Sequence, residues 1–282
     1  MRGAPAGAHM AGMDLDFSED EIRRYARHIL LAEVGGTGQA KLRAARVLIA
    51  GAGGLGSPLL LYLAAAGVGT IGLVDDDTVE LSNLQRQVAH GMDDLGRAKV
   101  ESAAAAARRI NPLVAIRPVQ ARLGRDNVLD LIRDYDLVCD GTDNFDTRFL
   151  LSDACVLAGK TLVSAAVLRF EGQLGVFKPH AGGPCYRCLH PVPPPPGLVP
   201  SCGEAGVLGA VTGVMGTLQA SEVLKEIMGI GETLAGRLLI WDALASRMRS
   251  ISLPRDPQCP ACGAHGYRDL AHHEELSPVC AG

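Results

Sequence analysis

The stretch Arg46-Val-Leu-Ile-Ala-Gly-Ala-Gly-Gly-Leu-Gly56 decides the fold. It opens with an apolar run of strand length, and the glycines that follow match the pattern G-x-G-x-x-G at Gly51, Gly53 and Gly56. Residues 57–66 have the composition of a helix, and residues 70–74 form a second apolar run. A strand, a glycine-rich turn, a helix and a second strand together predict one βαβ unit.

Short apolar strands continue to alternate with helices further along the chain. We predict three more of these strands, at residues 114–119, 136–140 and 161–166. After residue 166 the pattern changes, because residues 168–178 indicate a strand pair, residues 205–228 a long helix and residues 237–251 two more strands. The sequence therefore predicts a Rossmann-like, doubly wound α/β fold whose sheet is mostly parallel, with antiparallel C-terminal strands.

The glycine loop is predicted to bind the phosphates of a nucleotide. Glycines let the backbone approach phosphates closely, and the helix that follows presents unpaired N–H groups and the positive end of its dipole. Asp75 ends the second strand, where an acid can bind ribose hydroxyls. NAD and ATP both fit these features, so the loop alone does not choose between them.

A second group of residues favours nucleotidyl transfer over hydride transfer. Arg86, within Ser82-Asn-Leu-Gln-Arg-Gln87, and Lys99 supply positive charge. Nucleotidyl transfer needs such charge because negative charge moves onto the leaving pyrophosphate. Asp143, within Asp140-Gly-Thr-Asp-Asn144, follows a strand and can hold Mg²⁺ against phosphate oxygens. Each residue alone is also compatible with a solvated surface, so the argument depends on their sharing one edge of the sheet.

Two cysteine pairs, Cys185-Tyr-Arg-Cys188 and Cys259-Pro-Ala-Cys262, predict a zinc site. Four thiolates from two such pairs make a closed tetrahedral site, so we expect a structural zinc that clamps two distant segments. The alternatives are a redox pair and accidental spacing. Cys202 stands just before the long helix, where a thiol is favoured as a thiolate nucleophile, although a purely structural role fits equally well.

Composition narrows the class of protein. The net charge of −4 argues against a general nucleic-acid binder. The most apolar stretch, residues 59–68, is well short of the roughly 20 residues that span a bilayer, so we expect no membrane segment. Residues 1–17 are predicted to be a disordered lead-in without the apolar region of a secretory signal. We therefore expect a cytoplasmic protein.

Several motifs occur in the order found in the MoeB/ThiF/HesA family, the bacterial relatives of ubiquitin-activating enzymes. These are Arg24-Tyr-Ala-Arg27, the glycine loop, Ser82–Gln87, Lys99, Thr142-Asp-Asn144 and both cysteine pairs. Residues 18–263 resemble an adenylyltransferase domain of that family, and residues 264–282 are a tail with no resemblance that we can assign.

The resemblance implies a reaction: ATP and the C-terminal glycine carboxylate of a small ubiquitin-like sulfur carrier, of the MoaD or ThiS type, give an acyl-adenylate and pyrophosphate. The carrier would end in Gly-Gly and serve molybdopterin or thiamin biosynthesis. By matched motif, Asp75 would bind ribose and Asp143 would hold Mg²⁺. The full set of residues expected to contact the nucleotide is Gly51, Gly53, Gly54, Gly56, Asp75, Asp77, Ser82, Asn83, Arg86, Lys99, Asp143 and Asn144.

The resemblance also implies partners. Arg27 would reach into the ATP site of a second copy, so the active enzyme would be a homodimer. Arg27 would act there in catalysis together with Arg86 and Asp143. Cys202 falls where some relatives carry a thiol that attacks the adenylate or handles sulfur. Residues 264–282 are too few for the sulfur-delivering rhodanese domain of some relatives, so an external donor is expected. The alternatives are an NAD-dependent oxidoreductase, a non-catalytic scaffold, and a relative that dehydrates a tRNA base.

Overall fold

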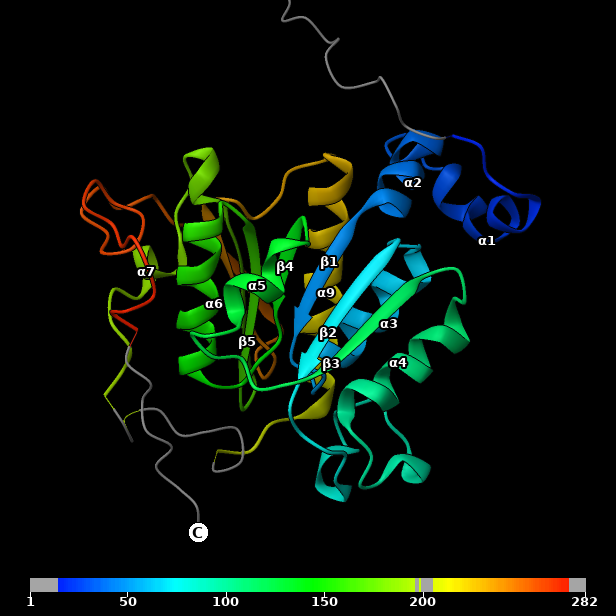
Figure 1. The fold of residues 1–282 in the computed structure, drawn as a ribbon, viewed down its shortest axis with the longest axis horizontal. Helices are drawn as coiled ribbons and strands as arrows, with labels where there is room; N and C mark the ends of the chain where they lie inside the picture. Colours follow the sequence, from blue (N-terminus) through cyan, green and yellow to red (C-terminus); the bar gives the residue numbers. More distant parts are fainter. Residues whose placement is uncertain (1–14, 196–197, 199–204, 274–282) are drawn as a thin grey trace, which may run out of the picture.

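An eight-stranded sheet forms the centre of the computed structural model, which describes residues 15–195, 198 and 205–273 (Figure 1). The strands are β1 (Arg46–Ala50), β2 (Thr70–Asp75), β3 (Ala115–Gln120), β4 (Leu137–Asp140), β5 (Thr161–Leu168), β6 (Glu171–Phe177), β7 (Arg237–Asp242) and β8 (Arg247–Ser252). Their spatial order is β3-β2-β1-β4-β5-β6-β7-β8. Pairing is parallel from β3 to β5 and antiparallel from β5 to β8, so the predicted Rossmann-like, mostly parallel sheet is confirmed.

Helices cover both faces of the sheet. They are α1 (Glu19–Ile29), α2 (Gly35–Ala44), α3 (Gly56–Ala66), α4 (Lys99–Ile110), α5 (Val128–Arg133), α6 (Phe145–Ala158), α7 (Tyr186–Leu189) and α9 (Gly209–Met228). Short 3₁₀ turns lie at η1 (Leu81–Asn83), η2 (Met92–Asp94) and η3 (Pro179–Ala181). Of the described residues, none belongs to a helix long and apolar enough to cross a membrane.

The central strands are apolar throughout because both of their faces are buried. Along β1, Val47 and Ile49 belong to the core beneath α2, α3, α4 and α9, whereas Leu48 and Ala50 belong to the core beneath α5 and α6. All four side chains are fully buried. This period of two between opposite cores explains why the sequence shows a continuous apolar run and no alternation with polar residues.

Two predicted elements differ from the structure. Residues 168–178 form no strand pair of their own, because β5 extends to Leu168 and pairs with the single strand β6. The long helix begins at Gly209 and not near residue 205, since Val207 forms a β-bridge with Arg169. Lys99 is the first residue of α4 and follows Gly96, which has a positive φ of 80°.

The N-terminal helices lie at the amino end of the parallel strands. Ser18 caps α1 with a capping box, which fixes where the helix begins. Tyr25 of α1 is buried, and its hydroxyl accepts a hydrogen bond at 2.8 Å from Nδ2 of Asn111, which stands between α4 and β3. Figure 1 shows α1 and α2, in blue, at the opposite end from the arrowhead of β2.

Residues that lie just outside the predicted domain boundaries, before residue 18 and after residue 263, contact the domain. Phe17 lies under the Arg43 guanidinium, 4.3 Å from the ring centroid. At the other end, Leu270 is buried in the core beneath α6, and Nε2 of His272 lies 3.2 Å from Oδ2 of the buried Asp153. The boundaries at residues 18 and 263 stay predictions, but the described segment 264–273 packs on α6.

Candidate active site

A cavity of about 1140 Å³ opens at the carboxyl ends of β1, β2 and β4. The order of these strands reverses between β1 and β4, which is where doubly wound sheets bind ligands. Nine residues that the sequence predicts to contact a nucleotide line the cavity: Gly51, Gly53, Gly54, Asp75, Asp77, Arg86, Lys99, Asp143 and Asn144. Residues from five separate segments thus meet in one place.

The glycine loop connects β1 to α3 in a conformation that side chains would obstruct. Gly51 has a positive φ of 93°. A Cβ at Gly56 would lie 1.8 Å from the carbonyl oxygen of Gly51, so glycine at this position is required by close packing. A Cβ at Gly54 would meet Thr212 Oγ1 at 3.2 Å and Arg86 Cγ at 3.3 Å. No side chain caps the N-terminus of α3, which leaves its positive end available to an anion.

One residue of the loop, Ala52, is held through both of its backbone polar groups. The N–H of Ala52 donates to Asp75 Oδ2 at 2.7 Å, and its carbonyl oxygen lies 3.0 Å from His90 Nε2. Because a carbonyl can only accept, Nε2 carries the proton, and Nδ1 accepts from the Ser102 hydroxyl at 2.8 Å. Burial lowers the pKa of His90, which favours this neutral ring.

Asp75 is held at the end of β2 by backbone groups. Its second oxygen, Oδ1, accepts the N–H of Asp77 at 2.9 Å. Burial raises the pKa of Asp75, and the N–H groups of Ala52 and Asp77 oppose this rise because they stabilise the carboxylate. The carboxylate therefore stands in a fixed position beside the glycine loop.

The two predicted cations differ in how they are held. Lys99 is buried, and its Nζ lies 2.6 Å from Asp77 Oδ2, an ion pair that orients the ammonium at the cavity wall. Arg86 is half-buried and donates from Nη1 to the carbonyl oxygen of Ser82 at 3.1 Å. Within the described residues, Asp75, Asp76 and Asp77 also bring three carboxylates within 4.8 Å of one another.

A buried ion pair shapes the loop that contains Asp143. Asp140 is fully buried, and Arg148 Nε donates to its Oδ2 at 2.9 Å. Thr142 donates twice to Oδ1 of Asp140, from its N–H at 3.0 Å and from its hydroxyl at 2.6 Å. Asp143 follows directly and is exposed at the cavity. Asn144 caps α6 by accepting the N–H of Thr147 at 2.9 Å.

Some predicted residues lie outside the cavity wall in the part of the chain described here. Gly56 packs beneath the loop. Asn83 is buried, and its Oδ1 accepts the N–H of Glu80 at 3.3 Å, while Ser82 is exposed. Arg27 is exposed in the last turn of α1, at the other end of the sheet. Cys202 lies outside the described residues. The nucleotide or catalytic roles of these residues stay predictions.

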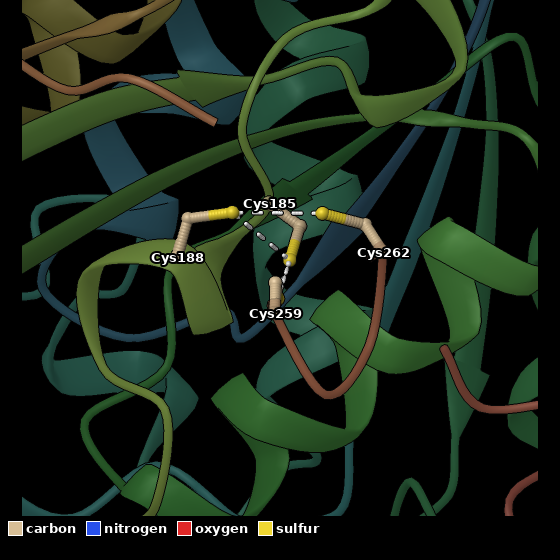
Figure 2. Close-up of side chains that lie close together, drawn as sticks. All are labelled: Cys185, Cys188, Cys259 and Cys262. Carbon is tan, nitrogen blue, oxygen red and sulfur yellow. Dashed lines mark hydrogen bonds between the residues drawn. The ribbon is translucent and has the colours of Figure 1, made fainter. Parts of the chain in front are cut away.

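The four predicted zinc ligands meet in space, as Figure 2 shows. Cys185 Sγ lies 3.5 Å from Cys259 Sγ, and Cys188 Sγ lies 3.5 Å from Cys262 Sγ. Thiolates at about 2.3 Å from a tetrahedral zinc ion stand roughly 3.8 Å apart, so the spacing fits Zn²⁺. Burial raises the pKa of Cys262 to about 11, so metal binding has to displace its proton.

A family model described as the ThiF family matches residues 25–261. The chain belongs to the ThiF family. Among relatives, this ThiF chain is 58% identical over 261 residues to "Adenylyltransferase and sulfurtransferase MOCS3" of Bos taurus, covering 92% of this chain and 57% of the relative. It is 49% identical to "Sulfur carrier protein adenylyltransferase" of Thermus thermophilus, covering 92% and 97% of the two chains. The ThiF chain thus spans just over half the length of the MOCS3 relative.

A solved structure shares the fold of this ThiF chain. The microcin C7 biosynthetic enzyme MccB, in complex with N-formylated MccA, is 25% identical with a TM-score of 0.76, over 85% of this chain and 75% of MccB.

Sequence reasoning missed several residues of the site. His90, Thr212, Tyr186 and His190 contact the loop or line the cavity, and Arg148 organises the Asp143 loop. For Tyr186, the sequence signal was its position between the two cysteines of the first pair. The others come from segments whose proximity to the loop depends on the fold.

Proposed function

We propose that this chain adenylates the C-terminal glycine carboxylate of a small ubiquitin-like sulfur carrier protein of the MoaD or ThiS type, with ATP as donor and pyrophosphate as leaving group. One observation supports the proposal above all: the glycine loop, Arg86, Lys99 and Asp143 line a single cavity. Its volume of about 1140 Å³ exceeds the roughly 300–1,000 Å³ of ordinary ligand sites and leaves room for a nucleotide and a peptide end.

The proposed reaction needs charge neutralisation more than proton transfer. A carboxylate oxygen attacks the α-phosphorus, and the bond from that phosphorus to the bridging oxygen breaks, so pyrophosphate leaves with the electron pair. Arg86 and Lys99 offset the negative charge that repels the carboxylate and that grows on pyrophosphate. Mg²⁺ held by Asp143 would supply further positive charge when bound. The exposed carboxylate of Asp143 suits this role, since Asp75 and Asp77 are already engaged by protein groups.

The remaining residues are proposed to hold ATP in place. Asp75 would bind the ribose hydroxyls, and Gly53 and Gly54 would let the triphosphate approach the backbone at the start of α3. Asp77 would orient Lys99. Asn144 would add a polar contact to the nucleotide. Ser82 and Asn83 would contact the nucleotide only if the η1 turn moved toward the cavity.

A homodimer is part of the proposal. Arg27 lies at the amino end of the sheet, opposite to the cavity of its own chain, so we assign it to the cavity of a second copy. Leu30 and Leu31, which follow it closely, are 75% and 52% exposed. Large apolar side chains beside a functional cation support an interface at this face.

Sulfur transfer is proposed to need an external sulfur donor and, in this chain, Cys202. An external protein would supply sulfur to the adenylate, and Cys202 would either attack the adenylate or carry sulfur. The names of the relatives, an adenylyltransferase and sulfurtransferase and a sulfur carrier protein adenylyltransferase, support a carrier as the substrate.

The test is ATP–pyrophosphate exchange in the presence of a candidate carrier. Labelled pyrophosphate is expected to appear in ATP only when the carrier has a free C-terminal glycine, because exchange requires the carboxylate to be adenylated. A carrier that lacks both of its terminal glycines is the matched control. Equal exchange with both carriers, or none with either, contradicts the proposal.

A further inference from the structure

Gln87 is a buried residue of the cavity wall, and none of the described residues binds its side chain. It is 3% exposed and lines the cavity together with the glycine loop. Its Oε1 is buried without a hydrogen-bond partner, and no described residue accepts a hydrogen bond from its Nε2. Because an unsatisfied buried polar group lowers stability, such a side chain calls for an explanation.

The other unpartnered polar atoms lie away from the cavity. Four other buried side chains have such an atom among the described residues, and none of them lines the cavity: Arg46, Ser152, Glu226 and Gln219. Gln219 is the best comparison, because it is fully buried and its Oε1 also lacks a partner. Its Nε2, however, donates to the carbonyl oxygens of Asp140 at 2.8 Å and Val163 at 2.9 Å. Gln219 thus has a structural role that Gln87 lacks.

The amide group of Gln87 lies beside the glycine loop. A Cβ on Gly53 would be 3.5 Å from Gln87 Nε2, so the NH₂ group is next to a backbone position that lines the same cavity. An amide NH₂ can only donate hydrogen bonds, and the oxygens of an ionised phosphate accept them. The side chain therefore places a neutral donor where the glycine loop lets phosphates approach.

The turn that contains Gln87 is fixed by the protein. The N–H of Gln87 donates to the carbonyl oxygen of Asn83 at 3.0 Å, and its carbonyl oxygen accepts the N–H of His90 at 3.0 Å. The preceding residues pack so closely on the start of α9 that the carbonyl oxygen of Gln85 leaves no room for a Cβ on Gly209. The amide of Gln87 is thus held in place before a ligand arrives, which lowers the entropic cost of binding.

We propose that Gln87 binds the triphosphate of ATP, and that its unpartnered side chain costs the protein stability in exchange for this contact. The inference rests on the proposed function, since it takes the ligand at the glycine loop to be ATP. A phosphate oxygen accepts the hydrogen bond from Nε2, and such a charge-assisted bond is stronger than one between neutral groups. A nucleoside without phosphates offers no such acceptor, so Gln87 contributes only to the binding of phosphorylated nucleotides.

The experiment compares Gln87→Met with the wild-type protein. ATP with Mg²⁺ is titrated by calorimetry, adenosine by ligand-detected NMR, which tolerates weak binding, and both proteins are unfolded by heat without nucleotide. The Kd for ATP is expected to rise about tenfold or more, as for loss of a hydrogen bond to a charged group, while the Kd for adenosine stays within about twofold. The melting temperature should stay the same or rise, because the substitution breaks no bond within the protein and removes an unpartnered atom.

Gln219→Met is the matched control, because it removes the amide of a buried glutamine that serves the protein. It should lower the melting temperature, since the carbonyl oxygens of Asp140 and Val163 lose a donor. The inference is overturned if Gln87→Met binds ATP as tightly as wild type, if it weakens adenosine binding as much as ATP binding, or if it melts early like Gln219→Met. Equal and normal ATP binding by Gln87→Met and wild type overturns only this inference, whereas no ATP binding by the wild-type protein overturns the proposed function as well.

Discussion

His90 Nε2 donates to the carbonyl oxygen of Ala52 at 3.0 Å and so fixes the glycine loop from beneath. Ser102 of α4 holds the other ring nitrogen, and Asp75 holds the N–H of Ala52. Lys99, at the start of α4, pairs with Asp77. One helix therefore anchors both the loop and the cation that are proposed to meet the triphosphate.

Loss of the His90 donor is expected to weaken ATP binding more than catalysis. In His90→Leu the Ala52 carbonyl keeps only the long contact with Ser57 Oγ at 3.5 Å, and an unsatisfied buried acceptor costs roughly 1–3 kcal/mol. The loop must then be ordered by ATP itself, so KM for ATP should rise about tenfold while kcat stays within about twofold. His90→Gln offers an amide donor and should stay closer to wild type. Exchange kinetics check this, and an unchanged KM in His90→Leu would show that the loop needs no anchor.

Acidification is expected to destabilise the protein partly through His90. Burial lowers the pKa of His90 in the folded state, where Asp75, Asp94 and Lys99 are the charged groups that act on it. As pH falls below about 6.5, the unfolded chain takes up a proton that the folded ring resists, so the free energy of unfolding decreases. His90→Gln should therefore lose less stability than wild type between pH 7.5 and 5.5. Thermal unfolding across this range tests it, and parallel curves for the two proteins refute it.

Alanine is expected to lower stability at one glycine of the loop and activity at another. At Gly56 a Cβ would lie 1.8 Å from the carbonyl oxygen of Gly51, so Gly56→Ala should lower the free energy of unfolding by about 3 kcal/mol or more. At Gly54 the new Cβ is only tight against Thr212 and Arg86. Gly54→Ala should fold normally but lose about tenfold in exchange activity, because Arg86 shifts. Thermal unfolding beside exchange kinetics distinguishes them, and full activity in Gly54→Ala contradicts the assigned position of Arg86.

Two inactive variants are expected to restore activity when mixed. Arg27→Ala removes the cation supplied to the other subunit, and Arg86→Ala removes one within the same subunit. After exchange of subunits, half of the dimers are mixed and each has one intact site, so about a quarter of wild-type exchange activity should return. Arg97→Ala, on the exposed surface, is the control and should be active alone. If the mixture stays inactive although mixed dimers form, Arg27 does not act across the interface.

The sequence was sufficient to predict those parts of the fold and of the site that depend on short, local motifs. The glycine loop, Asp75 and the cysteine pairs lie in short motifs whose geometry follows from strand ends, helix starts and ligand spacing. The structure places Asp75 beside the glycine loop and, at a separate site, brings the four cysteines together. The contact of His90 with Ala52 joins residues 38 positions apart, and only packing of α4 on the sheet creates it. Asn144 has a local role that we did not predict from the sequence: its side chain caps α6, and the residue also lines the cavity.

The mass of the carrier tests the central claim most directly. The protein is incubated with ATP, Mg²⁺ and each candidate carrier, and the carrier is then weighed by mass spectrometry. We expect one carrier to gain the mass of a single AMP moiety, in an amount that the Asp143→Ala variant cannot form. The account is contradicted if the carriers keep their original mass although the protein binds ATP, or if the adduct forms equally well on a carrier that lacks both of its terminal glycines.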